Sequence, residues 1–108
     1  MENKYSYIVL EDAEKDWEDI EYYITIKLCN PKAAEDFADE FFEKLDVYCA
    51  FPQSGAETKN EIFFDNDIRK FTVGNFIVFY KIDESQKTLI ILRIIYGPKE
   101  INKIGIRV

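Results

Sequence analysis

Four basic side chains in the second half of the sequence are the first candidates for chemistry. Arg69 and Arg93 interrupt stretches that are otherwise apolar, and Lys70 and Lys99 lie close to them in the sequence. A guanidinium can hold a phosphate through two parallel hydrogen bonds, and an ammonium adds a compact positive charge. These residues predict an anion site beside Arg69 and Arg93. The spacing is equally compatible with two arginines that pair with Asp or Glu at the rim of the core.

Two tyrosines extend this candidate site. Tyr80 and Tyr96 belong to neighbouring stretches of the same expected sheet. Aromatic rings can stack on nucleic-acid bases, and a phenol can donate a proton. The chain contains no histidine, so any proton transfer would have to use Arg, Lys, Tyr, Asp or Glu.

Three consecutive antiparallel strands are expected to position these residues. They span residues 68–73, 76–82 and 88–96, which are rich in β-branched and aromatic side chains. Gly74-Asn75 predicts a tight turn between the first two, because both residue types accept positive φ. The middle stretch is apolar on both faces, which favours a central position in the sheet. Gly97-Pro98 ends the third stretch, because proline has no N–H for a ladder.

A strand and two helices are expected before this meander. Residues 5–10 favour a strand. Glu11 or Asp12 is expected to cap a first helix, whose apolar residues recur with helical spacing at Ala13, Trp17, Ile20, Ile24 and Leu28. Asn30-Pro31 predicts the start of a second helix that stops near Phe51-Pro52. Its apolar face comprises Ala34, Phe37, Ala38, Phe41, Leu45 and Tyr48.

The element order predicts an α+β fold of type β-α-α-β-β-β in a single domain, residues 1–108. The short link between the helices predicts a helical hairpin packed on one face of a mainly antiparallel sheet. Residues 53–67 read as an irregular segment, and residues 99–104 as a short C-terminal helical turn. The open face of the sheet, or one end of it, is expected to carry the cations.

The charges are distributed unevenly along the chain. The net charge is −7, with 15 acidic and 5 basic residues from Met1 to Glu57 (a balance of −10) and 6 acidic and 9 basic residues from Thr58 to Val108 (a balance of +3). The total opposes nucleic-acid binding, whereas the basic half would suit an anionic partner. We interpret the acidic helices mainly as solvated surface.

Cysteine spacing and hydropathy argue against a metal-binding protein and against a membrane protein. Cys29 and Cys49 lack metal-ligand spacing, and we expect two buried, unpaired thiols on separate helices. No stretch reaches the roughly 18 apolar residues of a membrane span, and the N-terminus has no signal-peptide pattern. We therefore expect a cytoplasmic protein with no membrane contact.

Motifs in order along nearly the whole chain resemble the RelE/ParE superfamily of type II toxin–antitoxin toxins. The first half supplies Ala13, Asp16-Trp17 and Ile20, then Asn30-Pro31 with Ala33-Ala34, then Phe51-Pro52 with Gly55. The second half supplies Arg69, the 75–80 strand Asn-Phe-Ile-Val-Phe-Tyr and the 92–97 run Leu-Arg-Ile-Ile-Tyr-Gly. Each piece is short and common, and the resemblance lies in their order and spacing.

The resemblance implies a toxin without cofactor or metal, and we expect inhibition of translation, with gyrase inhibition or mere partner binding as the alternative. If catalytic, the toxin is a metal-independent endoribonuclease that cleaves mRNA on the ribosome. Arg69, Arg93, Lys99 and Tyr96 would then be catalytic, with a tyrosine or Glu57 and Glu61 moving protons. Lys70 and Tyr80 would contact nucleic acid. In the other branch the toxin inhibits DNA gyrase without nuclease chemistry, or binds a partner after losing its chemistry.

The resemblance also implies a protein partner. Toxins of this superfamily are blocked by a cognate antitoxin, which commonly wraps them with an amphipathic helix. The expected partners are thus the antitoxin and either the ribosome with mRNA or DNA gyrase. A homodimer is compatible with the sequence.

Overall fold

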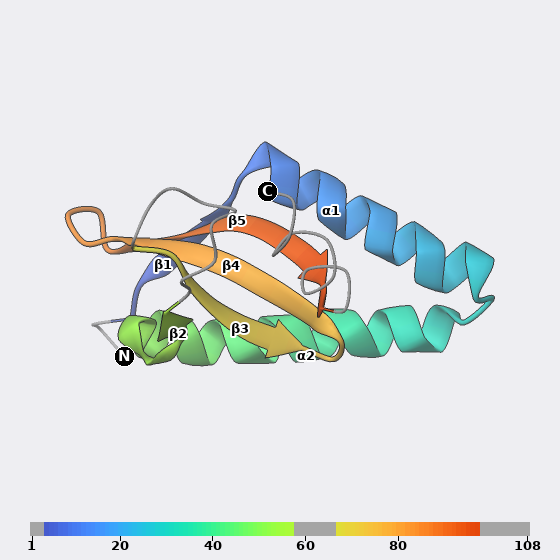
Figure 1. Cartoon of the computed structure of the whole chain (residues 1–108). Helices are drawn as coiled ribbons and strands as arrows, with labels where there is room; N and C mark the ends of the chain where they lie inside the picture. The colour runs from blue at the N-terminus through green and yellow to red at the C-terminus, as the bar shows by residue number, and fades with distance from the viewer. Residues whose placement is uncertain (1–3, 58–66, 98–108) are drawn as a thin grey trace.

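The computed structural model describes residues 4–57 and 67–97 and confirms the α+β prediction (Figure 1). Its elements are β1 (Ser6–Val9), α1 (Glu11–Tyr22), a π-helix (Tyr23–Lys27), α2 (Pro31–Ala50), a 3₁₀ turn (Pro52–Ser54), β2 (Ala56–Glu57), β3 (Arg69–Val73), β4 (Phe76–Asp83) and β5 (Thr88–Tyr96). The C-terminal helical turn expected at residues 99–104 lies outside the described residues. None of the described helices is both long enough and apolar enough to cross a membrane.

The sheet has the order β1-β5-β4-β3-β2. β1 runs parallel to β5, and the other three pairings are antiparallel. Gly74 has a φ of 59° in the tight turn between β3 and β4, as the sequence predicted. The two-residue strand β2 lies within a segment expected to be irregular, and it pairs with Lys70 and Arg69.

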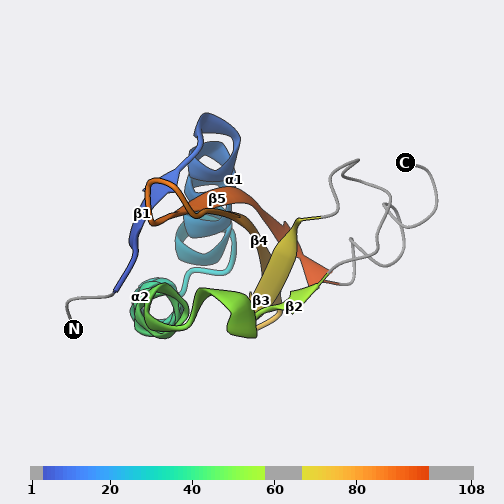
Figure 2. The ribbon, with the colours of Figure 1, turned by 90° about the vertical axis from the view of Figure 1, so that its left-hand side faces the viewer.

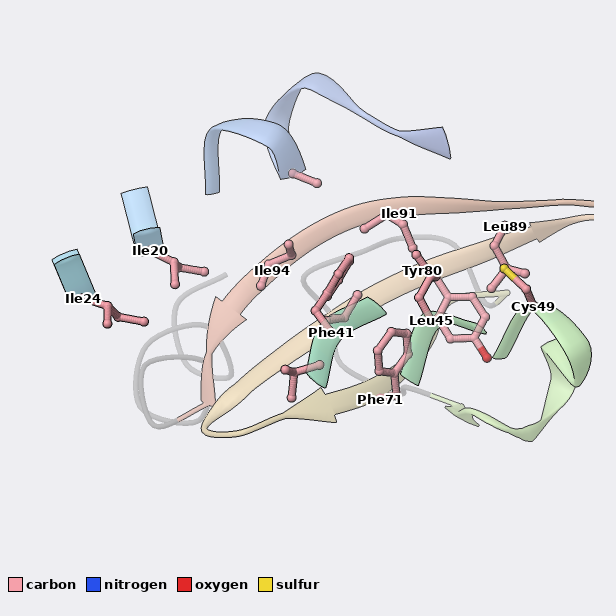
Figure 3. Packing of buried hydrophobic residues seen from close by; sticks show 13 residues of the cluster. Ile20, Ile24, Phe41, Leu45, Cys49, Phe71, Tyr80, Leu89, Ile91 and Ile94 are labelled. Atoms are coloured by element: carbon pink, nitrogen blue, oxygen red, sulfur yellow. The ribbon is translucent and has the colours of Figure 1, made fainter. Parts of the chain in front are cut away.

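The core lies between one face of the sheet and the two helices (Figures 2 and 3). α2 begins as predicted, because the Asn30 side chain accepts a hydrogen bond from the Ala33 N–H and Pro31 takes the first helical position. Core side chains come from all the major elements: Ala13, Ile20 and Ile24; Phe41, Leu45 and Cys49; Phe71 and Val73; Val78 and Tyr80; Leu89, Ile91 and Ile94. A smaller cluster of Ile68, Phe79 and Ile95 forms separately.

The first helix departs from prediction at both ends. It starts without a side-chain cap, since Leu10 and not Glu11 or Asp12 takes the capping position. At the other end, the turn widens into the π-helix, in which the Leu28 N–H donates to the Tyr23 carbonyl. The wider turn shifts the helical register. Leu28 therefore leaves the predicted apolar stripe and is exposed.

The predicted burial of both cysteines is correct for one of them. Cys49 is buried at the end of α2. Cys29 is exposed in the connection between the helices, with a φ of 51°. Both are free thiols in the structure.

β5 contains an irregularity that decides where Arg93 lies. The pairing with β4 shifts between Phe79, which faces Arg93, and Tyr80, which faces Ile91, so Leu92 is an extra residue. Such a bulge changes the alternation of side chains. Ile94 consequently takes the core position that uninterrupted alternation from Leu89 and Ile91 would give to Arg93.

Candidate functional site

The guanidinium of Arg69 is held by the chain segment that precedes β3. Its Nη1 donates to the carbonyls of Gly55 at 2.8 Å and Gln53 at 3.2 Å. Its Nη2 lies 3.4 Å from Glu57 Oε2, in an ion pair where the arginine side chain is 22% exposed. Three acceptors of the protein itself thus bind the Arg69 guanidinium. Fewer of its five N–H groups are left to bind a phosphate.

A hollow of about 260 Å³ opens beside Arg69. Three of its lining side chains are carboxylates and one is a guanidinium; the lining comprises Gln53, Glu57, Asp67, Arg69, Ile82 and Glu84. One of these acids, Glu84, accepts a hydrogen bond from Gln53 Nε2 at 3.1 Å. Among these lining residues, acidic side chains thus outnumber the single guanidinium.

Tyr80 is a core residue and does not present its ring to a ligand. It pairs with Arg69 across β3 and β4, and its side chain has 0% exposure. Its hydroxyl donates to the Pro52 carbonyl at 2.6 Å. Burial raises the pKa of Tyr80 to about 12, because desolvation penalises the phenolate. Contact between the Tyr80 ring and a base would require the side chain to leave the core, and the role of Tyr80 in nucleic-acid binding stays a prediction.

Arg93, on β5, is bound by a carboxylate of α1. Its Nε and Nη2 donate to the two oxygens of Asp16 on α1, at 2.7 and 2.9 Å. Asp16 Oδ2 also accepts the Ile94 N–H at 2.9 Å. The hydrogen bonds that Arg93 donates to Asp16 raise the pKa of Arg93, against the opposing effect of burial. This two-point pair is the rim ion pair that the sequence left open as an alternative.

Tyr96 lies close to this pair. Its ring packs against Phe76 with a centroid distance of 5.5 Å, and the side chain remains 45% exposed. Tyr96 and Arg93 line a shallow hollow of about 270 Å³ together with Asp16 and Asp19. This second hollow is also lined by more carboxylates than cations.

Comparison with known proteins decides the family. The family described as the ParE toxin of type II toxin–antitoxin system, parDE, matches residues 7–100. The chain belongs to the ParE toxin family. No curated protein matches it in sequence.

Several solved structures share the fold of this chain. The chromosomal ParDE toxin–antitoxin system from P. aeruginosa gives a TM-score of 0.64 at 20% identity, covering 87% of this chain and 97% of that one. The RelBE2 toxin–antitoxin complex from Mycobacterium tuberculosis gives a TM-score of 0.59 at 18% identity, covering 86% of this chain and 98% of that one. The archaeal RelE–RelB complex from Pyrococcus horikoshii OT3 gives a TM-score of 0.57 at 20% identity, covering 87% of this chain and 96% of that one. At these identities the likeness concerns the fold.

Among the described residues of this ParE-family chain, the predicted site residues do not form one cluster. Arg69 and Arg93 line different hollows, and Tyr96 lines the one that contains Arg93. Lys70 on β3 is half-buried between Phe79 and Ala56 of the flanking strands. Lys99 and Glu61 lie outside the described residues. In the described part of the chain, no cluster of three or more Cys, Asp or Glu side chains is arranged to bind a metal ion.

Two residues with important contacts were not assigned a role from the sequence. Asp16 completes the Arg93 pair, and Gly55 supplies a carbonyl to Arg69. Gly55 also lies against Tyr80 so closely that a Cβ there would overlap the phenol oxygen. Both residues occur in the motifs that carried the family resemblance, which was the available signal for them.

Proposed function

We propose that this ParE-family toxin acts by binding a macromolecular target, with DNA gyrase as that target, and that Arg69 and Arg93 do not form an RNA-cleaving centre. The observation that carries the proposal is the engagement of both guanidinium groups. Arg69 is bound by two carbonyls and Glu57, and Arg93 is bound by Asp16. Gyrase is chosen because the matching family is ParE and because the ParE branch works without nuclease chemistry.

The chemistry of RNA cleavage explains why these contacts matter. Attack of a 2′-hydroxyl on the adjacent phosphate develops negative charge, and a nuclease stabilises that charge with preorganised donors. Here Arg69 already donates three hydrogen bonds, and Arg93 two, to oxygens of the protein. Additional carboxylates line both hollows, namely Asp67 and Glu84 in one and Asp19 in the other. Carboxylates beside both arginines disfavour the binding of a phosphate there.

We further propose that the co-encoded antitoxin is the regulatory partner. The three similar structures described above are toxin–antitoxin systems or complexes. This pairing predicts that expression of the chain alone arrests growth and that co-expression of the antitoxin restores it. Since gyrase and ribosomes are both cytoplasmic targets, we expect the toxin to act in the cytoplasm.

Two assays on the same purified protein test the proposed function. In the first, gyrase supercoils a relaxed plasmid while the toxin is titrated in. In the second, purified ribosomes carrying an mRNA are incubated with toxin, and cleavage is mapped by primer extension. We expect inhibition in the first and intact mRNA in the second. Cleavage at discrete codons would replace the proposal with ribosome-dependent endoribonuclease activity.

A further inference from the structure

The tip of the helical hairpin, residues 22–30, presents a group of exposed apolar side chains. Tyr22, Tyr23, Ile26 and Leu28 are each more than half exposed. Figure 1 shows the connection between the two helices extending past the end of the sheet. Single exposed apolar residues are ordinary, whereas several within one short stretch mark a surface that binds another molecule.

The core does not need these four side chains. Ile20 and Ile24 already supply the buried side of the same stretch. Tyr22 and Ile26 are four residues apart, which places them one turn apart along the helix. The π-helix adds Leu28 to the exposed residues, because its wider turn takes Leu28 out of the apolar stripe. The apolar tip is therefore a surface of its own and not the margin of the core.

Hydrogen bonds of the main chain hold the tip in a fixed shape. The Leu28 N–H donates to the Tyr23 carbonyl at 3.0 Å, and the Asn30 N–H donates to the Ile24 carbonyl at 3.1 Å. Between them, Cys29 has a φ of 51°, in a region that few residues other than glycine adopt. A surface with such a defined backbone loses little conformational freedom on binding, which favours affinity.

Acidic side chains flank the tip on both helices. Residues 18–39 carry six acidic and two basic side chains, a balance of −4, and all six acids are exposed. The acids are Glu18, Asp19, Glu21, Glu35, Asp36 and Asp39. One of the two lysines, Lys32, already pairs with Asp36 at 3.0 Å. The tip thus complements a surface with an apolar centre and with lysine or arginine around it.

We propose that the hairpin tip is the surface with which this toxin contacts DNA gyrase, at an apolar pocket of the enzyme rimmed by lysine or arginine. The inference rests on the proposed function, which names gyrase as the target but no surface for the contact. Gyrase binds DNA phosphates and therefore exposes basic groups, which the acidic flanks complement. The tip contains neither Arg69 nor Arg93, so contact there requires no nuclease chemistry.

Two substitutions at equally exposed positions test the apolar centre. Ile26→Arg places a charge at the tip, whereas Val47→Arg places one in the last third of α2; both side chains are 52% exposed. The full-length toxin is titrated into gyrase that supercoils a relaxed plasmid, and circular dichroism checks that both variants fold. We expect Ile26→Arg to raise the half-inhibiting concentration at least about tenfold and Val47→Arg to leave it within about threefold. Equal concentrations for the two variants would overturn the proposal.

A pair of charge reversals tests the basic rim. Glu21→Lys reverses an exposed acid beside the tip, and Glu43→Lys reverses an exposed acid farther along α2. We expect Glu21→Lys to raise the half-inhibiting concentration at least about threefold and Glu43→Lys to leave it unchanged, because a charge at the rim of an interface acts over a short range in salt. The same effect from both would contradict a basic rim around the tip.

Chemical modification tests the tip without an apolar substitution. Cys29 is exposed and Cys49 is buried, so a maleimide-linked polyethylene glycol couples at Cys29. Cys29→Ser treated in the same way is the control. We expect the modified parent to lose gyrase inhibition and the treated control to keep it. Full inhibition by the modified parent would overturn the proposal.

The antitoxin distinguishes this contact from other uses of the tip. The purified antitoxin encoded beside this chain is titrated calorimetrically into Ile26→Arg, and we expect its Kd to stay within about threefold of the parent value. A parallel loss of antitoxin binding, or a toxin dimer that Ile26→Arg dissociates, would assign the tip to another occupant and overturn the inference. Failure of the proposed function would show separately, as full gyrase activity with the unmodified parent toxin.

Discussion

The carboxylate of Asp16 on α1 binds Arg93 and the main chain of β5 at the same time. It accepts hydrogen bonds from Arg93 Nε and Nη2 and from the Ile94 N–H, and its side chain is 14% exposed. β1 covers only residues 88–91 of β5, so Asp16 supplies an acceptor where β1 has ended. The pair therefore joins α1 to the sheet, which is a structural role for an arginine expected to bind phosphate.

This arrangement predicts unequal effects for the two partners. Asp16→Ala leaves the Ile94 N–H without its acceptor and Arg93 without its counter-ion, so we expect a loss of about 2–3 kcal/mol in the free energy of unfolding. Arg93→Ala leaves the bond from Ile94 to Asp16 in place, and we expect a loss of about 1 kcal/mol. Urea denaturation of the two variants measures both values. A larger loss for Arg93→Ala would contradict the assigned role of Asp16.

Tyr80 predicts a pH dependence of stability. Its pKa in the folded protein, about 12, lies above the ordinary value of 10.0, so folding favours the neutral phenol. The stabilisation is complete below pH 10 and is lost as the pH rises towards 12, because the unfolded chain releases the proton first. Between pH 8 and 11, we expect the parent to lose roughly 1 kcal/mol more than Tyr80→Phe does. Equal losses in urea denaturation would show that the phenol is not buried as described.

Gly55 predicts a packing defect on substitution. Its backbone is extended, with φ −70° and ψ 150°, so alanine is acceptable to the backbone itself. The added Cβ would nevertheless overlap the Tyr80 phenol. We expect Gly55→Ala to lower the free energy of unfolding by about 1–3 kcal/mol.

The double variant Gly55→Ala/Tyr80→Phe is the control for this interpretation. Removing the phenol oxygen relieves part of the overlap, so the combined loss should be smaller than the sum of the two single losses. Strict additivity in thermal unfolding would mean that the two residues do not compete for space.

A substitution of Glu57 distinguishes a toxin that acts by binding from one that acts by catalysis. Glu57→Gln removes the carboxylate beside Arg69 without shortening the side chain, and Glu57 is 62% exposed, so folding should change little. If the toxin acts by binding, growth arrest by Glu57→Gln should match that of the parent, measured as colony counts after induction. A marked gain of toxicity together with RNA cleavage would instead indicate that freeing Arg69 activates a nuclease.

The sequence predicted the elements better than it predicted the surroundings of the arginines. β5 matched its expected range of 88–96, and α2 started at Pro31 as expected, because apolar patterning and capping are local signals. The Leu92 bulge and the π-helix depend on tertiary packing, and no local pattern marks them. The Arg93 partner lies 77 residues away on another element. Spacing alone could not choose between an ion pair and a ligand site.

Gyrase supercoiling in the presence of increasing toxin tests the central claim most directly. The assay uses purified gyrase, a relaxed plasmid and the full-length chain, with a heat-denatured sample as the control. The account predicts a saturable loss of supercoiled product that returns when the antitoxin is added. Undiminished supercoiling at toxin concentrations that arrest growth would contradict gyrase as the target.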